Sequence, residues 1–527
     1  MAQFLDLFSF LSVLLRGLTL SAEALTLGGV VFLLLVSRGV LTHKISRFLI
    51  ASCVLLVLSQ AGYIAANSAI LMSSTSLTWL DLVGAGYFVA GLFIIAGGVA
   101  IAGASGTSAG RFVFPVAAGA ILAGSVMTSH AFGRLHDRAL AAGLTLAHQI
   151  ATAAWIGAMP YLLVALRHME TPQAVIVTNR FSRLAIFCVA VLFAAGIGLS
   201  LLYIGSVPAL GTTYGAMVIG KIILTLAILS FGSLNFQIVR AVRSGAGANM
   251  LPLRRFAEAE IGIGFTVVLA AAALTSAPPA IDVKIDRVTA PEIVQRIRPK
   301  PPVFETPPLN QLSPPTPLRS DDPRQPGSFV PGSQRLLPDT PGDIAWSEYN
   351  HHWAGLIVLA IGLLGLASRR FRWARNWPLI FLALAAFLLV RSDPENWPLG
   401  PRGFWESFTI AEVAQHRIFV LLLVLFAAFE WAVQTGHISG RRAGLVFPLV
   451  CAVGGALLLT HSHSLTNVKQ EFLIELSHLP LAILAVLAGW SRWLEIRLPA
   501  ERTRVFAWVW PACFVLIGLV LLNYREV

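Results

Sequence analysis

Fourteen apolar runs divide this chain, and they constrain its fold more than any other feature of the sequence. The runs begin near positions 12, 46, 80, 112, 141, 181, 214, 257, 351, 377, 417, 444, 471 and 505. A helix of about 20 apolar residues crosses a bilayer, and a backbone in lipid must form its hydrogen bonds within its own segment. The runs also lack the alternation of barrel strands. The sequence therefore predicts an all-α polytopic membrane protein with about 14 transmembrane helices, of which the short run from 377 to 390 is tilted, re-entrant or extended by its flanks.

Composition and charge agree with a membrane protein whose main partner is the lipid bilayer. Hydrophobic residues make up 56% of the chain and charged residues 12%, which excludes a soluble globular protein. The net charge of +12 does not indicate a nucleic-acid partner, because the basic residues recur at every second loop instead of forming one soluble module. Such clusters occur at Arg38, Arg183, Arg255, Arg372 and Arg442. These loops are predicted to be cytoplasmic, so both termini are predicted to be periplasmic.

A proline-rich segment separates the first eight runs from the last six. Residues 277–345 hold 16 of the 29 prolines and show little amphipathic periodicity, so we expect an extended linker on the outer side. The predicted organisation is an eight-helix module at 1–276, an extracytoplasmic linker at 277–349 and a six-helix module at 350–527. A tether is the favoured role of the linker, and a partner-binding arm is the alternative. No feature of the sequence indicates an oligomeric state.

Histidines are distributed unevenly in this topology. Only His43, His168 and His437 fall at predicted cytoplasmic loops. The other nine fall at the outer ends of spans or in outer loops: His130, His136, His148, His351, His352, His416, His461, His463 and His478. This distribution favours a function on the outer face.

The stretch from 461 to 478 holds the densest group of candidate metal ligands. Glu471, Glu475 and His478 are spaced i, i+4 and i+7, which places them on one face of a helix. Glu475 and His478 form an E-x-x-H step, a spacing at which a carboxylate and an imidazole reach one metal. A charged, unpaired group at this depth costs on the order of 3 kcal/mol, so it should face a partner, water or an ion. The alternative is a Glu-to-His hydrogen bond that ties two helices together.

His461 and His463 precede this helix and form an H-x-H pair. Their side chains point the same way only if the stretch is extended, and such a pair suits copper or zinc. The alternative is that both are interfacial histidines facing water.

The first module carries a parallel set. His130 closes one predicted span, His136 lies in the outer loop and is as readily a solvated residue, and His148 lies about two turns down the next helix. Met127, three residues before His130, offers a thioether if copper is handled as Cu(I).

Few other ionisable residues lie inside the predicted spans. Arg16 and Glu23 are seven residues apart in the first span, and we favour a structural ion pair between them. Lys221 either neutralises a carboxylate or repels cations. The accessory candidates are therefore Met127, Glu471, His416, Glu23 and Lys221.

Several of these motifs resemble the copper resistance protein D (CopD) family. In the first module the resemblance lies in SHAFG, in AHQIATAAWIGAMPYL and in residues 181–235. In the second it lies in HHWAGL, DPENWPLGPRGFWESF, FEWAVQTG, THSHSLTNVKQEFLIELSH and WVWPACFVLIGLVLLNYRE, which are similar to the C-terminal module of the longer family members. It covers most of the chain except the proline-rich linker.

The resemblance implies a bacterial inner-membrane protein that handles copper ions, either by transport or by loading copper enzymes. The positions it implies are His130, His148, His461, His463 and His478. Nothing from 277 to 345 looks like the CopC-type β-sandwich of many relatives, so we expect a separate periplasmic CopC-like donor. No nucleotide-binding loop is present, and we expect a transporter driven passively or by an ion gradient and not an enzyme.

Two alternatives remain beside copper transport. One is a membrane electron carrier in which His148 and His478 hold haem b as axial ligands. The other is a non-transporting assembly factor for a periplasmic copper enzyme.

Overall fold

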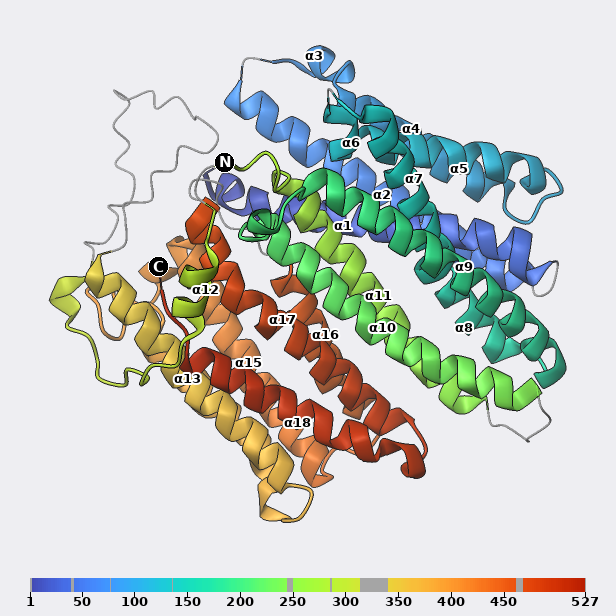
Figure 1. The fold of residues 1–527 in the computed structure, drawn as a ribbon. Helices are drawn as coiled ribbons and strands as arrows, with labels where there is room; N and C mark the ends of the chain where they lie inside the picture. The colour runs from blue at the N-terminus through green and yellow to red at the C-terminus, as the bar shows by residue number, and fades with distance from the viewer. Residues whose placement is uncertain are drawn as a thin grey trace. The chain divides into compact units, whose positions relative to one another are not determined.

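The computed structural model describes residues 2–38, 42–75, 77–134, 136–243, 250–284, 287–312, 340–460 and 468–526 (Figure 1). These residues fold into two compact units. The first unit comprises Met1–Arg287 with Leu459–Ser462, and the second comprises Val288–Leu458 with His463–Val527. Each unit is described by itself below.

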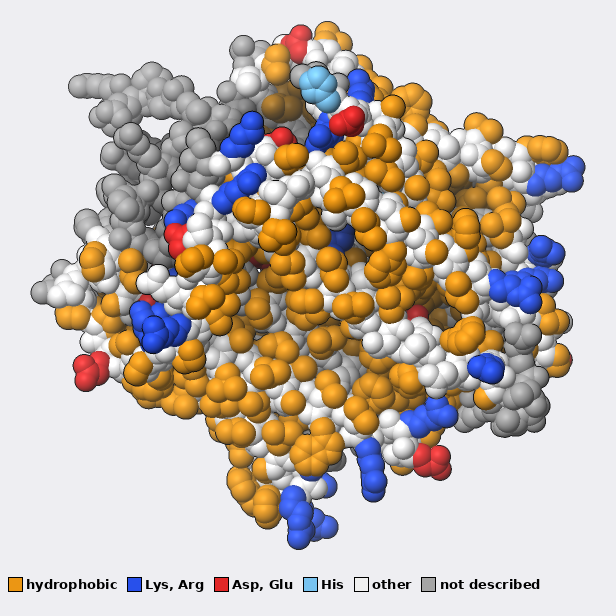
Figure 2. Space-filling model, in the orientation of Figure 1, with side chains coloured by type: hydrophobic (Ala, Val, Ile, Leu, Met, Phe, Trp, Pro, Cys, Tyr) orange, Lys and Arg blue, Asp and Glu red, His pale blue; other side chains and the backbone are white. Residues whose placement is uncertain are grey.

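Helices long and apolar enough to span a membrane account for nearly all the predicted runs, and the described residues form no β-strand. Within the described residues thirteen helices meet this criterion, and the run near 444 forms a shorter apolar helix, Ala443–Leu458. Apolar side chains cover most of the face seen in Figure 2, with Lys and Arg gathered toward its edges. The all-α polytopic fold predicted from the sequence is therefore confirmed. The short run near 377 begins with the 3-10 segment Trp373–Leu379, which brings the span to Trp373–Arg391.

The first unit contains eight membrane-length spans and two short helices. Its helices are α1 (Ala2–Val31), α2 (Thr42–Ser74), α3 (Trp79–Val83), α4 (Gly86–Ala104), α5 (Gly110–Met127), α6 (His130–Gly133), α7 (Arg138–Thr152), α8 (Met159–His168), α9 (Thr171–Tyr203), α10 (Thr213–Arg243) and α11 (Leu251–Ser276). A π-helical segment, Ala153–Gly157, joins α7 to α8 within one span. Another, Phe32–Ser37, prolongs α1.

Helix α1 packs against α2, α11 and the π-helical segment 153–157, and the last of these contacts is backbone to backbone. A Cβ atom on Gly157 would lie 1.8 Å from the Ala24 carbonyl oxygen, and one on Gly28 would lie 2.2 Å from the Gly157 carbonyl carbon. Only glycine permits this approach, which holds α1 against the π-helical segment of the fifth span.

The second unit is built around aromatic side chains. Its helices are α12 (Ala290–Ile297), α13 (Pro341–Ala367), α14 (Ile380–Arg391), α15 (Ala411–Thr435), α16 (Val446–Leu458), α17 (Val468–Arg497) and α18 (Ala500–Leu522). Trp377, Phe447 and Trp510 are buried at its core, with ring centroids 5.1 to 5.4 Å apart. Gly362 of α13 and Gly518 of α18 let those two helices approach closely.

The segment predicted to be an extended linker contains the helix α12 and the 3-10 turn Leu309–Gln311 among its described residues, and α13 begins within it at Pro341. Thr289 and Glu292 form a capping box at the start of α12. Arg296 donates to the carbonyl oxygens of Arg525 and Glu526, so the helix is attached to the C-terminal tail of the second unit. Proline content alone did not reveal this attachment.

Replacing Gly157 with alanine is expected to destabilise the first unit by about 1–3 kcal/mol, because the new Cβ overlaps the Ala24 carbonyl. Thermal unfolding of the purified protein in detergent measures the loss. The matched control is Gly143→Ala on α7, where a Cβ meets nothing within 4 Å. Equal unfolding temperatures for the two variants would contradict the close packing of α1 on this segment.

Candidate functional site

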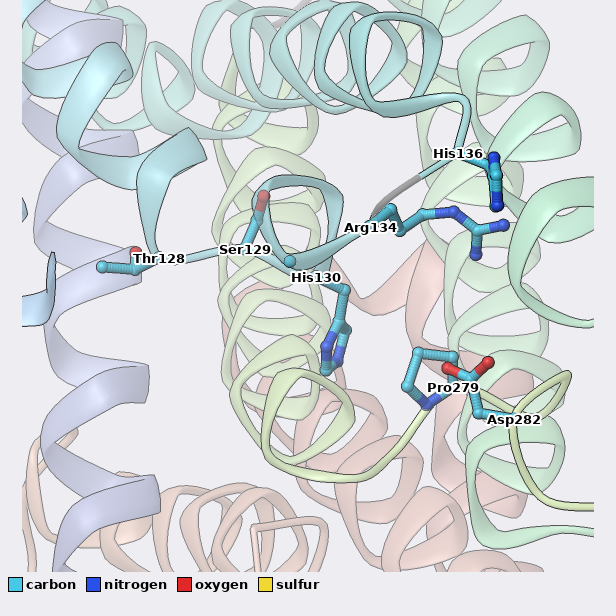
Figure 3. A pocket seen from close by; sticks show the side chains of 8 residues that line it. Thr128, Ser129, His130, Arg134, His136, Pro279 and Asp282 are labelled. Carbon is cyan, nitrogen blue, oxygen red and sulfur yellow. The ribbon is translucent and has the colours of Figure 1, made fainter.

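A pocket of about 490 Å³ lies at one end of the first unit, which we call the α6 end (Figure 3). It is lined by Thr128, Ser129, His130, Gly133, Arg134, His136, Pro279 and Asp282. Two imidazoles, one carboxylate and one guanidinium therefore line the same space. In Figure 3 the His130 ring points toward Pro279, while His136 lies beside Arg134.

Three chain segments build this pocket. Helix α5 ends at Met127, and the single turn α6 that follows presents His130. Asp137, in the left-handed conformation with a φ of 57°, turns the chain into α7 just after His136. The third segment follows α11, where Ile281 donates from its backbone nitrogen to the Tyr203 carbonyl at 2.8 Å and so positions Asp282.

His130 is held by residues of α9, α10 and α11. Its ring centroid lies 6.1 Å from that of Tyr203 and 6.4 Å from that of Tyr214, and its Nε2 lies 3.5 Å from the Leu274 carbonyl oxygen. Burial lowers the pKa of His130 below its usual range, although the Leu274 carbonyl and Asp282 oppose the shift. The ring therefore favours its neutral form, which is the form that binds metals.

Arg134 brings a fixed positive charge to the pocket wall. Its guanidinium lies over the Tyr203 ring, 5.6 Å from the centroid, and donates to the Leu202 carbonyl at 3.3 Å. His136 and Asp282 are exposed. Met127 is not among the residues that line the pocket.

His148 lies outside this pocket, on the part of α7 that faces α9. Its Cε1 lies 3.7 Å from the position that a Cβ on Gly196 would occupy, and its Nδ1 has no hydrogen-bond partner among the described residues. Lys221 of α10 is close enough for its charge to act on this ring. A charged Lys221 works against a cation at His148.

The ion pair predicted between Arg16 and Glu23 is wrong in its direct form. Arg16 donates instead to the Thr128 hydroxyl at 2.9 Å, and Glu23 accepts a hydrogen bond of 2.8 Å from Ser125. Both charged side chains are buried on α1. The seven-residue spacing places them two turns apart, where neighbouring hydroxyl groups of α5 are nearer than the opposite charge.

In the second unit, His478 belongs to a cluster around Tyr524. The His351 ring stacks on the Tyr524 ring at 3.7 Å between centroids, and the His478 ring meets it edge-on at 6.5 Å. The Tyr524 hydroxyl donates to Glu526 at 2.9 Å, and Ser347 donates to the same carboxylate. Two imidazoles therefore flank one phenol ring.

His352, next to His351, has a structural role. Its Nδ1 accepts from the Val303 backbone nitrogen at 2.9 Å, and its Nε2 donates to the Tyr524 carbonyl oxygen at 3.0 Å. Both nitrogens are occupied, so the ring joins α13 to the segment after α12 and to the C-terminal tail.

Helix α17 carries Glu471, Glu475 and His478, and both carboxyl groups are buried. His478 Nδ1 lies 2.9 Å from the Ile474 carbonyl oxygen, one turn earlier on the same helix. His461 and His463 lie outside the described residues.

His416 pairs with Asp393, with 2.8 Å between Nδ1 and the carboxylate oxygen. Burial alone would raise the pKa of Asp393, but the hydrogen bonds from His416 and Ser392 hold it below its usual range. This accessory candidate is therefore engaged in a local contact with a carboxylate.

Across the part of the chain that the structure describes, no three His, Cys, Asp or Glu side chains are placed to share one metal ion. The ligand types predicted from the sequence are present in pairs: His130 with His136 in the pocket, and His351 with His478 around Tyr524.

The fold and the pocket define a polytopic membrane protein with an imidazole-lined pocket at one end of its first unit. Residues 175–274 match the family model of Copper resistance protein D. The match covers α9 almost entirely, all of α10 and nearly all of α11, and it confirms the resemblance inferred from the sequence there. No curated protein and no solved structure matches the chain.

Several residues of these sites were not predicted from the sequence. Asp282 lies in the proline-rich segment, and only its position just after α11 indicated that it returns to the α6 end. Tyr524 and Glu526 follow the last span, and their polar side chains after a long apolar run were the available signal. Arg296 had none.

Replacing Arg296 with glutamine is expected to loosen α12 and the C-terminal tail. The change weakens charge-assisted hydrogen bonds to two carbonyls, so amide exchange at residues 523–526 should rise about tenfold or more. Hydrogen-exchange mass spectrometry measures this effect. Arg298→Gln is the control because that side chain is exposed, and an equal increase in both variants would contradict the proposed attachment.

Proposed function

We propose that this protein captures copper ions in the pocket at the α6 end and carries them across the membrane. The observation that carries the proposal is that the CopD-family region surrounds His130. Tyr203, Tyr214 and Leu274, which contact the His130 ring, all lie within the matched residues 175–274. The apolar helices and the match of residues 175–274 to the Copper resistance protein D family model are independent of this proposal.

The chemistry of the pocket suits copper as a transported ion. Neutral imidazoles bind copper well, and His130 is held in its neutral form by burial. His136 and the Asp282 carboxylate line the same pocket and offer further ligands. A pair of ligands without a closed cage favours binding that is strong enough for capture and weak enough for release.

The orientation of the pocket follows from charge. Arginines gather toward the end opposite to α6, for example Arg183 of α9 and Arg255 of α11, and by the positive-inside rule this supports our proposal that the α6 end lies outside the cytoplasm. In a bacterial inner membrane this end faces the periplasm, where a separate CopC-like donor would deliver copper.

The second unit offers a further candidate binding site for the copper ion. His351 and His478 flank Tyr524, and the buried Glu475 lies one turn before His478 on α17. His461 and His463 precede this helix in the sequence and complete the proposed set of ligands. Carboxylates along a helix face favour the passage of a cation in a low-dielectric interior.

The double variant His130→Ala/His136→Ala is expected to lower copper binding at least about tenfold, because it removes both imidazoles from the pocket. Titration of purified protein with copper, and copper uptake into proteoliposomes, measure the effect. The control is His168→Ala, an exposed histidine at the end of α8 away from the pocket.

Three outcomes would count against the proposal. Unchanged uptake in the double variant would remove the pocket from the pathway. Copper binding without uptake by the wild-type protein would favour the assembly factor. A Soret band with stoichiometric haem would favour the electron carrier.

Copper binding should also depend on pH through His130. Protonation of an imidazole displaces the metal, and burial lowers the pKa of His130 below its ordinary value of about 6.5. In the His136→Ala protein, where His130 is the remaining imidazole of the pocket, binding should persist as pH falls through about 6.5 and be lost below it. Affinity measured across a pH series checks this, and a midpoint above that value would contradict it.

A further inference from the structure

A stripe of polar side chains runs along one buried face of α1. Arg16, Thr19, Glu23 and Thr26 follow the three- and four-residue spacing that aligns side chains on one side of a helix. Each is at most 5% exposed. A polar stripe buried in a membrane-spanning helix is costly unless its groups have partners or a function.

Two of these side chains are matched by polar groups of α5. Arg16 donates to the Thr128 hydroxyl at 2.9 Å, and Thr128 also lines the pocket at the α6 end. Glu23 accepts from Ser125 of α5 at 2.8 Å, three residues before Thr128, which caps the end of that helix. The two contacts form successive steps from the pocket floor into the membrane-spanning part of the unit.

The second step continues to α7. Gln149 donates from its Nε2 to the Ser125 hydroxyl at 3.1 Å, so Ser125 accepts one hydrogen bond and donates the other to Glu23 Oε2. The other carboxylate oxygen, Oε1, is buried and has no hydrogen-bond partner among the described residues. Arg16 does not form a direct ion pair with it.

We propose that Glu23 is a proton-binding site reached from the pocket at the α6 end. An ionised carboxylate with one unmatched oxygen is expensive in a low-dielectric interior, and a bound proton removes that charge. Ser125 can donate to the ionised form, so both states of the carboxyl group have support and the proton can be exchanged. The proposal does not require that the protein binds copper.

Few titratable groups face this stripe from the neighbouring helices. Tyr63 of α2 lies against Arg16, with 5.9 Å from the guanidinium carbon to the ring centroid, and the Cys53 thiol of α2 lies beside Thr26. From α11, Leu269 meets α1 at Gly17. Within the described residues, Arg16 supplies the charge that acts on Glu23.

A proton fits this site better than a metal ion. Hydroxyl, amide and carboxyl groups surround Glu23, and these groups do not bind copper as imidazole or thioether groups do. Arg16 stands between the pocket and Glu23, where its positive charge opposes the entry of a metal cation. A proton needs no set of metal ligands, so the hydroxyl and amide groups around Glu23 are sufficient for it.

Difference infrared spectroscopy of the reconstituted full-length protein, from about pH 4 to about pH 10, tests the proposal. A protonated-carboxyl band should appear as pH falls, and Glu23→Gln should abolish it. Ser125→Ala should move its midpoint to higher pH, because the variant loses a donor to the ionised form. The control Glu260→Gln removes a different buried carboxyl, which is bonded to Asn235 on α10, and should leave the Glu23 band in place.

The rate of hydrogen–deuterium exchange at Glu23 tests whether its proton is reached from the pocket. Thr128→Leu removes the hydroxyl at the pocket floor and should slow the deuterium shift of the Glu23 band several-fold. Ser129→Leu changes the pocket wall without changing the partner of Arg16 and should not. A band unaffected by Glu23→Gln, or equal exchange in all variants, would overturn the proposal. If Glu23→Gln does not fold, Glu23→Asp, which should shift the frequency of the band, takes its place.

Discussion

The first unit depends on the close approach of α1 to the π-helical segment of the fifth span. Gly28 and Gly157 permit this contact, and the carbonyl of Ala24 lies directly against Gly157. Glu23 precedes Ala24, and Gln149 lies one turn before the π-helical segment, so the same contact brings the polar face of α1 beside α5 and α7. A side chain at either glycine would separate the helices that hold Ser125 between Glu23 and Gln149. The hydrogen bonds that link Gln149, Ser125 and Glu23 are therefore a consequence of backbone packing.

The family-matching region has a specific structural role in this unit. Helices α9, α10 and α11 supply Tyr203, Tyr214 and the Leu274 carbonyl, which hold the His130 ring from outside its own segment. Burial by these residues keeps the imidazole in its neutral form. The residues that hold His130 in the pocket are thus also residues that match the family model, although His130 itself lies before the matched region.

The sequence predicted the helices well because hydrophobic length is a local property, and each span needs about 20 apolar residues regardless of its neighbours. The sequence also grouped His130, His136 and His148 in one set; the first two line the pocket, and His148 does not. It did not predict that Asp282 joins them or that His351 meets Tyr524, because these contacts depend on how distant helix ends pack. The ion pair expected within α1 failed for the same reason, since Thr128 and Ser125 of α5 offered nearer partners.

The charges near the pocket of the first unit differ from those along α17 of the second unit in a way that bears on cation transport. Arg16 and Lys221 place positive charge below the pocket and beside His148 in the first unit, while α17 of the second unit carries the buried carboxyl groups of Glu471 and Glu475. In a medium of low dielectric constant, a cation is repelled along the first arrangement and attracted along the second. If copper is the transported ion, the first unit is suited to capture and proton exchange, and the helix face of α17 is suited to passage. The proposed division of roles therefore rests on the charges beside each of these two paths and not on each unit as a whole, because the first unit also buries the carboxyl groups of Glu23, Glu258 and Glu260.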